Sequence, residues 1–305
     1  MPGTKKKLFK FFSLMLGTAI ALSGCFPSGA QKTRRPQIDA SPWTEKKVQN
    51  KSSGNWYRYM YKAGPTEDAP VAILLHGGIF DNRIWLNFHR LSKKYTVYAP
   101  QYPDSSPLYN RKIEDWGKVV TDFVKAVNVS PSLIVGVSNG AYGAIEYLLQ
   151  NDVQSAKGLV LISTAMLSSS KKEIKKRTRM ARFALRLSPG KLQGLVESRA
   201  EGTEYASSPG KVTQKDIFYV RPYPYYYQLF SVPYTQGDKK QKTHNIKLPV
   251  LILHGTEDEI MPLWTAEDTL SAFDNATLKT FSGEGHDMTF SIGPTLCDVI
   301  LEHYN

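Results

Sequence analysis

Cysteine is scarce in this chain: of its 305 residues only Cys25 and Cys297 are cysteines. Two cysteines cannot build the disulfide framework that holds small secreted domains together, so that class of fold is excluded. We find no internal repeat. A hydrophobic fraction of 41% and a charged fraction of 22% are ordinary for a soluble globular protein, and 17 tyrosines supply material for a sizeable core.

The first 25 residues lack acidic side chains and have the features of an export signal. Four lysines precede the apolar run FFSLMLGTAIAL, which is too short to span a bilayer comfortably. A basic segment, a short apolar run and small residues before a cut site are typical of a secretory signal peptide, here residues 1–24. No disulfide partner is expected for Cys25.

The tetrapeptide LSGC at residues 22–25 resembles the lipobox of bacterial lipoproteins, in which the cysteine is lipidated and becomes the mature N-terminus. The resemblance implies export, with Cys25 as the lipid anchor and residues 25–43 as a solvated tether. Phe26 stands where an inner-membrane retention signal has aspartate, so a diderm host would imply the outer membrane. An ordinary signal peptide with an incidental cysteine is the alternative.

Positive charge is concentrated in residues 165–247, which hold 17 Lys and Arg against six Asp and Glu. For an exported protein we expect no nucleic-acid partner, and an anionic membrane surface suits this charge better. Within this segment Met180, Phe183, Ala184 and Leu187 form an apolar stripe at helical spacing beside a basic face. Such a helix can lie on a membrane or cover an active site with its charges in solvent, and the pattern leaves both open.

Short continuous apolar runs recur through the middle and the end of the chain. Runs of this kind are typical of strands buried on both faces of a parallel sheet. They cover residues 71–75, 95–100, 132–138, 158–163 and 249–255. Apolar residues at helical spacing lie between them, at 113–129 and 141–150. The alternation predicts an α/β fold with a mostly parallel central sheet flanked by helices.

Two segments frame this pattern. Ahead of it, residues 44–50 and 55–63 are strand-like and are separated by a turn signal at 52–54. Residues 165–247 interrupt it, because they are basic, rich in tyrosine and without a run typical of a central strand. We predict that they form a mostly helical cap inserted into an α/β domain of residues 44–305.

Residues 134–143, IVGVSNGAYG, place Gly-x-Ser-x-Gly where a predicted strand meets a predicted helix. The pentapeptide alone arises by chance about one time in ten in a chain of this composition, so its context decides. A sharp strand–turn–helix requires small residues on either side, here Gly136 and Gly140, and lifts the serine hydroxyl into solvent. Ser138 is therefore a candidate nucleophile, and the N–H of Asn139 is a candidate oxyanion donor.

A second oxyanion donor has to come from a loop after an earlier strand, and LLHGGIFDNRIW at residues 74–85 provides such a loop. Gly77 and Gly78 would let backbone amides approach a ligand closely, with Gly78 as the candidate donor. A plain glycine turn between strand and helix is the alternative for this loop taken alone.

A serine nucleophile needs a base, and the base needs an orienting carboxylate. Among six histidines, His286 in the loop SGEGHDM is the best candidate because it follows the last strand-like run. The acid comes from HGTEDEIMP, where Glu257, Asp258 and Glu259 follow a predicted strand. The order serine, acid, histidine is that of the α/β-hydrolase architecture.

Together these motifs resemble the α/β-hydrolase superfamily over residues 44–304, apart from the insertion. HGG at residues 76–78 matches the oxyanion loop of that family and Trp85 its downstream tryptophan, while GVSNG at 136–140 matches its nucleophile elbow. The acid motif HG-x-x-D-x-x-x-P selects Asp258 over its glutamate neighbours, and the Gly-His motif falls on His286. Gln101 departs from the usual aspartate at its position.

The resemblance implies a serine hydrolase that needs no metal or cofactor and cleaves a small apolar acyl substrate. A carboxylesterase or lipase-like activity is the leading prediction. The same triad serves C–C bond hydrolases, thioesterases and acyltransferases, which remain open. A non-catalytic envelope lipoprotein of this fold is a further alternative, and its signature would be a missing triad residue.

Overall fold

The computed structural model describes residues 38–39, 43–77, 82–101, 114–164, 204–208, 210–213, 240–259 and 261–305. The predicted signal peptide, Cys25 and nearly all of the predicted tether lie outside these residues. Most of the predicted cap lies outside them as well, including its basic helix.

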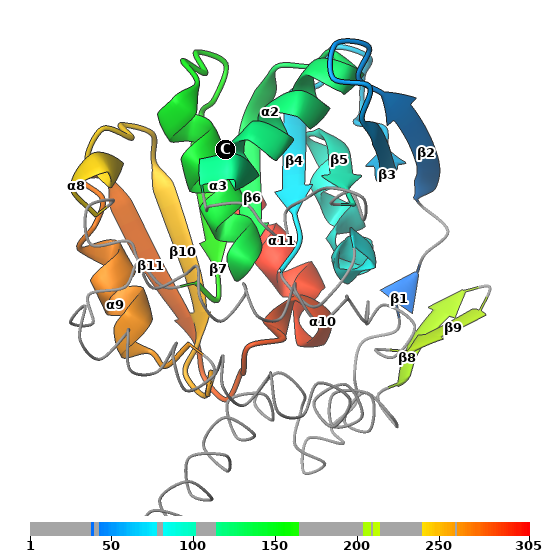
Figure 1. The fold of residues 1–305 in the computed structure, drawn as a ribbon. Helices are drawn as coiled ribbons and strands as arrows, with labels where there is room; N and C mark the ends of the chain where they lie inside the picture. Colours follow the sequence, from blue (N-terminus) through cyan, green and yellow to red (C-terminus); the bar gives the residue numbers. More distant parts are fainter. Residues whose placement is uncertain are drawn as a thin grey trace, which may run out of the picture.

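Eight strands form the main sheet, in the order β11-β10-β7-β6-β4-β5-β3-β2 (Figure 1). Its strands are β2 (Thr44–Gln49), β3 (Trp56–Lys62), β4 (Val71–Leu75), β5 (Thr96–Pro100), β6 (Pro131–Val137), β7 (Gly158–Ile162), β10 (Val250–Gly255) and β11 (Ala276–Phe281). The strands from β11 to β5 in this order pair in parallel. At the other edge, β3 pairs antiparallel with β5, and β2 pairs antiparallel with β3. The five apolar runs and the two leading strand-like segments all coincide with strands of this sheet, so the predicted α/β fold is confirmed.

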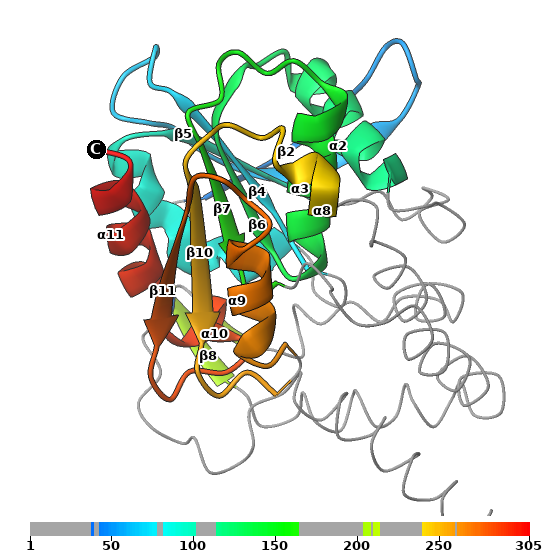
Figure 2. The same ribbon diagram turned by 90° about the vertical axis from the view of Figure 1, so that its left-hand side faces the viewer.

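Helices cover both faces of the sheet (Figure 2). On one face lie α2 (Glu114–Val127), α3 (Asn139–Gln150) and α9 (Trp264–Leu270). The other face carries η1 (Asn82–Lys93), α10 (Met288–Ser291) and α11 (Gly293–His303). The short helix α8 (Lys240–Thr243) precedes β10 in the chain.

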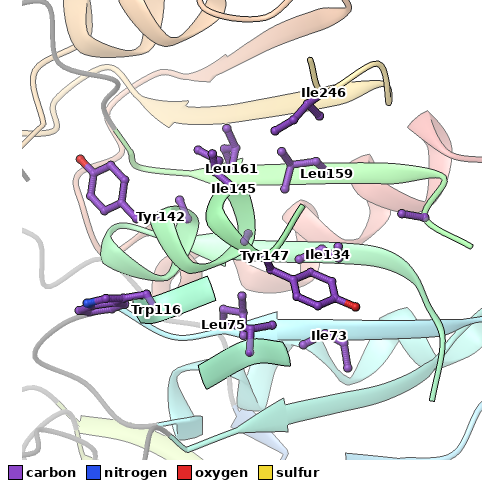
Figure 3. Packing of buried hydrophobic residues seen from close by; sticks show 14 of the residues in the cluster. Ile73, Leu75, Trp116, Ile134, Tyr142, Ile145, Tyr147, Leu159, Leu161 and Ile246 are labelled. Atoms are coloured by element: carbon purple, nitrogen blue, oxygen red, sulfur yellow. The ribbon is translucent and has the colours of Figure 1, made fainter. Parts of the chain in front are cut away.

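The central strands send alternate side chains into two separate cores. Ile73 and Leu75 of β4 pack toward α2 and α3, together with Ile134 of β6 (Figure 3). Leu74 and Val135, one residue further along, belong to the core under η1 and α11. Because both faces are buried, these strands are apolar at nearly every position, which is why their runs are continuous rather than alternating.

Cys297 lies in α11 and is fully buried in the core between α11 and η1. Burial raises the pKa of its thiol well above the usual value. Cys297 therefore acts as a small apolar residue of the core.

The turn between β2 and β3 is held on α2 by one carboxylate. Asp122 of α2 accepts hydrogen bonds from the amides of Asn50 (2.7 Å) and Asn55 (2.9 Å). It also accepts from the hydroxyls of Ser53 (2.9 Å) and Tyr57 (2.6 Å). Four donors thus satisfy one side chain, and they anchor the outer antiparallel hairpin to the helical layer.

A second, three-stranded sheet pairs β1 (Ile38–Asp39) in parallel with β8 (Glu204–Ser208), which forms an antiparallel hairpin with β9 (Gly210–Thr213). β8 and β9 fall within the predicted cap, so that segment contains a short hairpin, whereas the helix predicted there lies outside the described residues. In the described part of the chain, no helix has the length and apolar character to cross a membrane.

Candidate active site

Ser138 occupies the turn between β6 and α3 in a backbone conformation that is rare for a residue with a side chain. Its φ is 51° and its ψ is −119°, in the region where a Cβ crowds its own backbone. The turn is held by the Ser138 N–H, which donates to the carbonyl of Ile162 at 2.9 Å. The hydroxyl of Ser138 forms no capping bond to α3, although serine commonly caps helices. The side chain is half-buried.

Close packing explains both glycines of the elbow. A Cβ on Gly136 would lie 2.5 Å from the Cα of Ala141, in the first turn of α3. A Cβ on Gly140 would lie 2.0 Å from the carbonyl oxygen of Leu75, at the end of β4. From the sequence, a sharp turn explains these glycines. The structure shows in addition that α3 packs so closely against β6 and β4 that a side chain has no room at either position.

The oxyanion side of the site begins next to the nucleophile. A Cβ on Gly77 would lie 3.4 Å from the Cβ of Ser138, so the start of the glycine loop packs against the elbow. Asn139 is the first residue of α3, where helix geometry leaves backbone N–H groups without intrahelical partners. Gly78, the predicted second donor, lies outside the described residues.

Gln101 helps to hold the far end of this loop. Its side-chain oxygen accepts a hydrogen bond of 2.9 Å from the backbone N–H of Asn82, where η1 begins. The amide of Asn82 donates in turn to the carbonyl of Ala99 at 3.0 Å. The residue that departs from the usual family pattern therefore ties the glycine loop to the end of β5.

Asp258 and His286 meet in a hydrogen bond. The Nδ1 atom of His286 lies 2.8 Å from Oδ2 of Asp258, whose side chain is fully buried, and 10% of the His286 side chain is exposed. Because an ionised carboxylate only accepts, His286 donates through Nδ1–H and keeps Nε2 as the proton acceptor. Glu257 and Glu259 are exposed, so of the three acids it is Asp258 that meets the histidine.

The two loops that carry this pair are joined along their backbones. Glu257 N–H donates to the carbonyl of Glu284 at 2.9 Å, and Gly283 N–H donates to the hydroxyl of Thr256 at 3.0 Å. A Cβ on Gly255 would lie 2.2 Å from the carbonyl oxygen of Glu284. Gly255 therefore permits the close approach that brings the acid loop and the histidine loop together.

Asp258 and His286 each stabilise the charged form of the other, which opposes the effect of burial on both groups. Burial by itself would raise the pKa of Asp258 and lower that of His286. Their mutual attraction and hydrogen bond prevail, so the pKa of Asp258 is lowered and that of His286 is raised. An ionised Asp258 thereby favours an imidazolium at His286 whenever that ring takes a proton.

Comparison with known proteins identifies the family. Residues 105–291, more than half of the chain, match the hydrolase family described as serine aminopeptidase, S33. The chain belongs to this family of α/β-hydrolases. No curated protein matches its sequence significantly.

Solved α/β-hydrolase structures share its fold at low sequence identity. A hydrolase from Pseudomonas aeruginosa PA01 has a TM-score of 0.63 and 15% identity, over 87% of this chain and 98% of that one. A thermophilic esterase from Thermogutta terrifontis, bound to malate, has a TM-score of 0.63 and 16% identity, over 85% and 97%. MenH from S. aureus has a TM-score of 0.65 and 18% identity, over 80% and 96%.

At the carboxyl edge of the parallel strands this hydrolase places Ser138 after β6, Asp258 after β10 and His286 after β11. Strand β7 separates β6 from β10 in the sheet. The remaining histidines have other contacts. His89 and His303 lie in η1 and α11, and exposed His244 bonds to Asp274 at 2.6 Å.

Two further polar residues of the hydrolase lie at the same edge and were missed by the sequence analysis. Ser163, directly after β7, has a φ of 47° and is fully buried, and its hydroxyl has no hydrogen-bond partner among the described residues. His254 of β10 is fully buried beside the acid loop. The acid motif HGTEDEIMP includes His254 but does not show what its ring contacts, and the left-handed conformation of Ser163 depends on tertiary packing, so the sequence assigns neither residue a role.

Proposed function

We propose that this hydrolase cleaves carboxylic esters through an acyl-enzyme on Ser138. The supporting observation is the 2.8 Å hydrogen bond between Asp258 and His286, at the same sheet edge as a serine in a strained elbow. A fixed acid–histidine pair near a turn that presents a hydroxyl is the arrangement that activates serine in hydrolases.

In the proposed reaction the oxygen of Ser138 attacks the acyl carbonyl while Nε2 of His286 takes the hydroxyl proton. The backbone N–H of Asn139, with that of Gly78 proposed from the sequence, stabilises the oxyanion of the tetrahedral intermediate. The C–O bond to the alcohol breaks, and His286 returns the proton to the leaving oxygen. Water, deprotonated by His286, then hydrolyses the acyl-enzyme and frees the acid and Ser138.

An apolar acyl group suits the surroundings of the proposed site. Trp264 begins α9, six residues beyond Asp258, and its side chain is 47% exposed although it is large and apolar. The sequence of the predicted cap is rich in tyrosine. Both features favour a carbon chain over a charged group as the substrate's acyl part.

A panel of p-nitrophenyl esters of increasing acyl length, assayed with wild type and Ser138→Ala, tests this function. We expect wild type to hydrolyse at least one ester with an initial burst of nitrophenol, and the variant to show neither burst nor turnover. Aminoacyl anilides, thioesters and acyl acceptors belong in the same panel. Turnover of any of these without ester cleavage would overturn the ester assignment.

We also propose that the enzyme is exported and held on a bacterial membrane by a lipid on Cys25. The support is the sequence alone, through the basic start, the short apolar run and LSGC. Growth with a clickable palmitate analogue should label the wild-type chain and leave Cys25→Ser unlabelled. Equal labelling of the two, or none of either, would contradict the anchor.

A further inference from the structure

A second histidine lies against the acid of the proposed triad. His254 is in β10, four residues before Asp258, and none of its side chain is exposed. Its Nε2 atom is 2.6 Å from the carbonyl oxygen of Met261 and 3.8 Å from Oδ2 of Asp258. The first distance is a hydrogen bond, and the second is too long for one.

The hydrogen bond to Met261 determines which ring nitrogen of His254 carries the proton. A carbonyl oxygen only accepts, so Nε2 must be the N–H donor. The other nitrogen, Nδ1, is buried and has no hydrogen-bond partner in the part of the chain that the structure describes. A proton added there would create a buried N–H without an acceptor, which costs free energy, so the ring is held neutral.

Met261 connects this histidine to the acid. Its backbone N–H donates to Oδ1 of Asp258 at 2.8 Å, while its carbonyl accepts from His254. One peptide segment therefore receives a bond from the rigid strand β10 and gives a bond to the carboxylate. Asp258 uses Oδ1 for this segment and Oδ2 for His286, so the orientation of the carboxylate toward His286 depends on where Met261 sits.

We infer that His254 is a positioning residue: it fixes the Met261 turn, and through it the Asp258 carboxylate, in the orientation that His286 needs. The inference rests on the proposed function, because it concerns the same triad. The two histidines around Asp258 then have separate tasks. His286 moves the proton, and His254 stays neutral and acts as a permanent donor.

The electrostatic surroundings keep these tasks apart. Burial lowers the pKa of His254 more than Asp258 raises it, whereas the pKa of His286 is raised by Asp258. Asp287 beside His286 acts in the same direction on that ring. On the flanking strands, Ser163 follows β7 and Thr280 of β11 pairs with His254, and neither side chain titrates. Of the two histidines beside Asp258, His286 is the one favoured as a cation.

Three variants of His254 distinguish the effect of losing the N–H donor to Met261 from the effect of losing the imidazole ring. His254→Leu removes the donor, His254→Gln keeps an amide N–H near the position of Nε2, and His254→Asn carries the same amide too short to reach Met261. We expect kcat on the best ester to fall by about 100-fold in the leucine and asparagine variants, with KM within about twofold. The glutamine variant should stay within about tenfold of wild type.

The acid limb of the pH–rate profile shows whether the effect passes through Asp258. If the carboxylate loses its orientation, the pKa of His286 falls toward its ordinary value, so the limb moves to lower pH in the leucine and asparagine variants. A merely structural loss would reduce the active fraction without moving the limb. In an Asp258→Asn background, His254→Leu should change kcat by less than about twofold.

Two outcomes would overturn the inference while Ser138→Ala remains inactive. One is equal activity of the glutamine and asparagine variants, and that comparison stands even if the leucine variant does not fold. The other is an unmoved acid limb in every variant that loses activity. Activity of Ser138→Ala would instead overturn the proposed function itself, whatever the His254 variants do.

Discussion

The β2–β3 turn and the carboxyl edge of the parallel strands differ in how their polar side chains are hydrogen-bonded. At the turn, Asp122 accepts from four side-chain donors. At the edge, the hydroxyl of Ser163 and Nδ1 of His254 are buried, and neither has a hydrogen-bond partner within the ranges that the structure describes. Two serines there, Ser138 and Ser163, have positive φ values. The turn thus satisfies its carboxylate with several donors, whereas the edge combines strained serine backbone with buried polar atoms, a combination that is common at functional sites.

A third residue with positive φ shows that this contrast is not a matter of φ alone. Asn128 has a φ of 52°, but it directly follows α2, where a left-handed residue commonly ends a helix and asparagine tolerates the conformation. Ser138 precedes a helix instead, and no common helix-end motif accounts for its positive φ. Its strain has to be maintained by the packing of β4, β6 and α3 around it.

The largest expected effect contrasts the two aspartates. Asp258→Asn should lower kcat by about 10,000-fold, because the amide no longer holds His286 in the tautomer that accepts the serine proton. Asp122→Asn should leave kcat within about twofold, since that carboxylate serves only the hairpin. Steady-state ester hydrolysis by the two purified variants measures this. Comparable losses of kcat would remove the distinction between the two sites.

The next effect contrasts two glycines. Gly140→Ala should lower the free energy of unfolding by about 3 kcal/mol or more, because its Cβ would lie 2.0 Å from a backbone oxygen of β4. Gly54→Ala should cost about 1 kcal/mol, since space around it is open and only its φ of 74° opposes a side chain. Urea titration of each variant gives both values. A smaller loss at Gly140 would mean that the elbow can relax.

A smaller effect tests the hairpin anchor. Asp122→Ala should lower the free energy of unfolding by about 2 to 3 kcal/mol, because it removes four hydrogen bonds from a half-buried network. Asn55→Ala removes one of the four and should cost about 1 kcal/mol. Thermal unfolding of both, read against unchanged kcat, checks the separation. If kcat fell with Asp122→Ala, the hairpin and the site would be coupled.

The smallest effect concerns pH. Catalysis needs His286 neutral, and its pKa is raised above the ordinary value, so kcat/KM should fall as the pH drops through a value above 6.5. Asp287 contributes to that rise, so Asp287→Asn should move the acid limb to lower pH without abolishing activity. Asp274→Asn, which alters only the contacts to His244 and Lys247, is the matched control. If the acid limb moved to higher pH in Asp287→Asn, Asp287 could not be raising the pKa of His286.

The sequence predicts the sheet and the chemistry-bearing positions because both leave local signatures. Strands buried on two faces are apolar at nearly every position, and residues 158–163 and 249–255 correspond to β7 and β10 on that ground. The elbow is visible because steric crowding demands Gly136 and Gly140. Asp258 was singled out from its two glutamate neighbours by family resemblance and not by physics.

What the sequence does not predict depends on contacts between distant segments. The order of the strands, the pairing of β1 with β8 and the close approach of Gly255 to Glu284 all involve residues far apart in the chain. His254 is one of six histidines in the sequence. It begins the acid motif HGTEDEIMP, but its bond to Met261 beside the acid is seen only in the structure.

The most direct test of the account is covalent labelling with a fluorophosphonate, followed by mass mapping of the labelled peptide. We expect one adduct, on the peptide that contains Ser138, in folded wild type. We expect no adduct in Ser138→Ala and a strongly slowed one in Asp258→Asn. An adduct at another residue, equal labelling of wild type and Ser138→Ala, or no labelling of the folded wild type would contradict it.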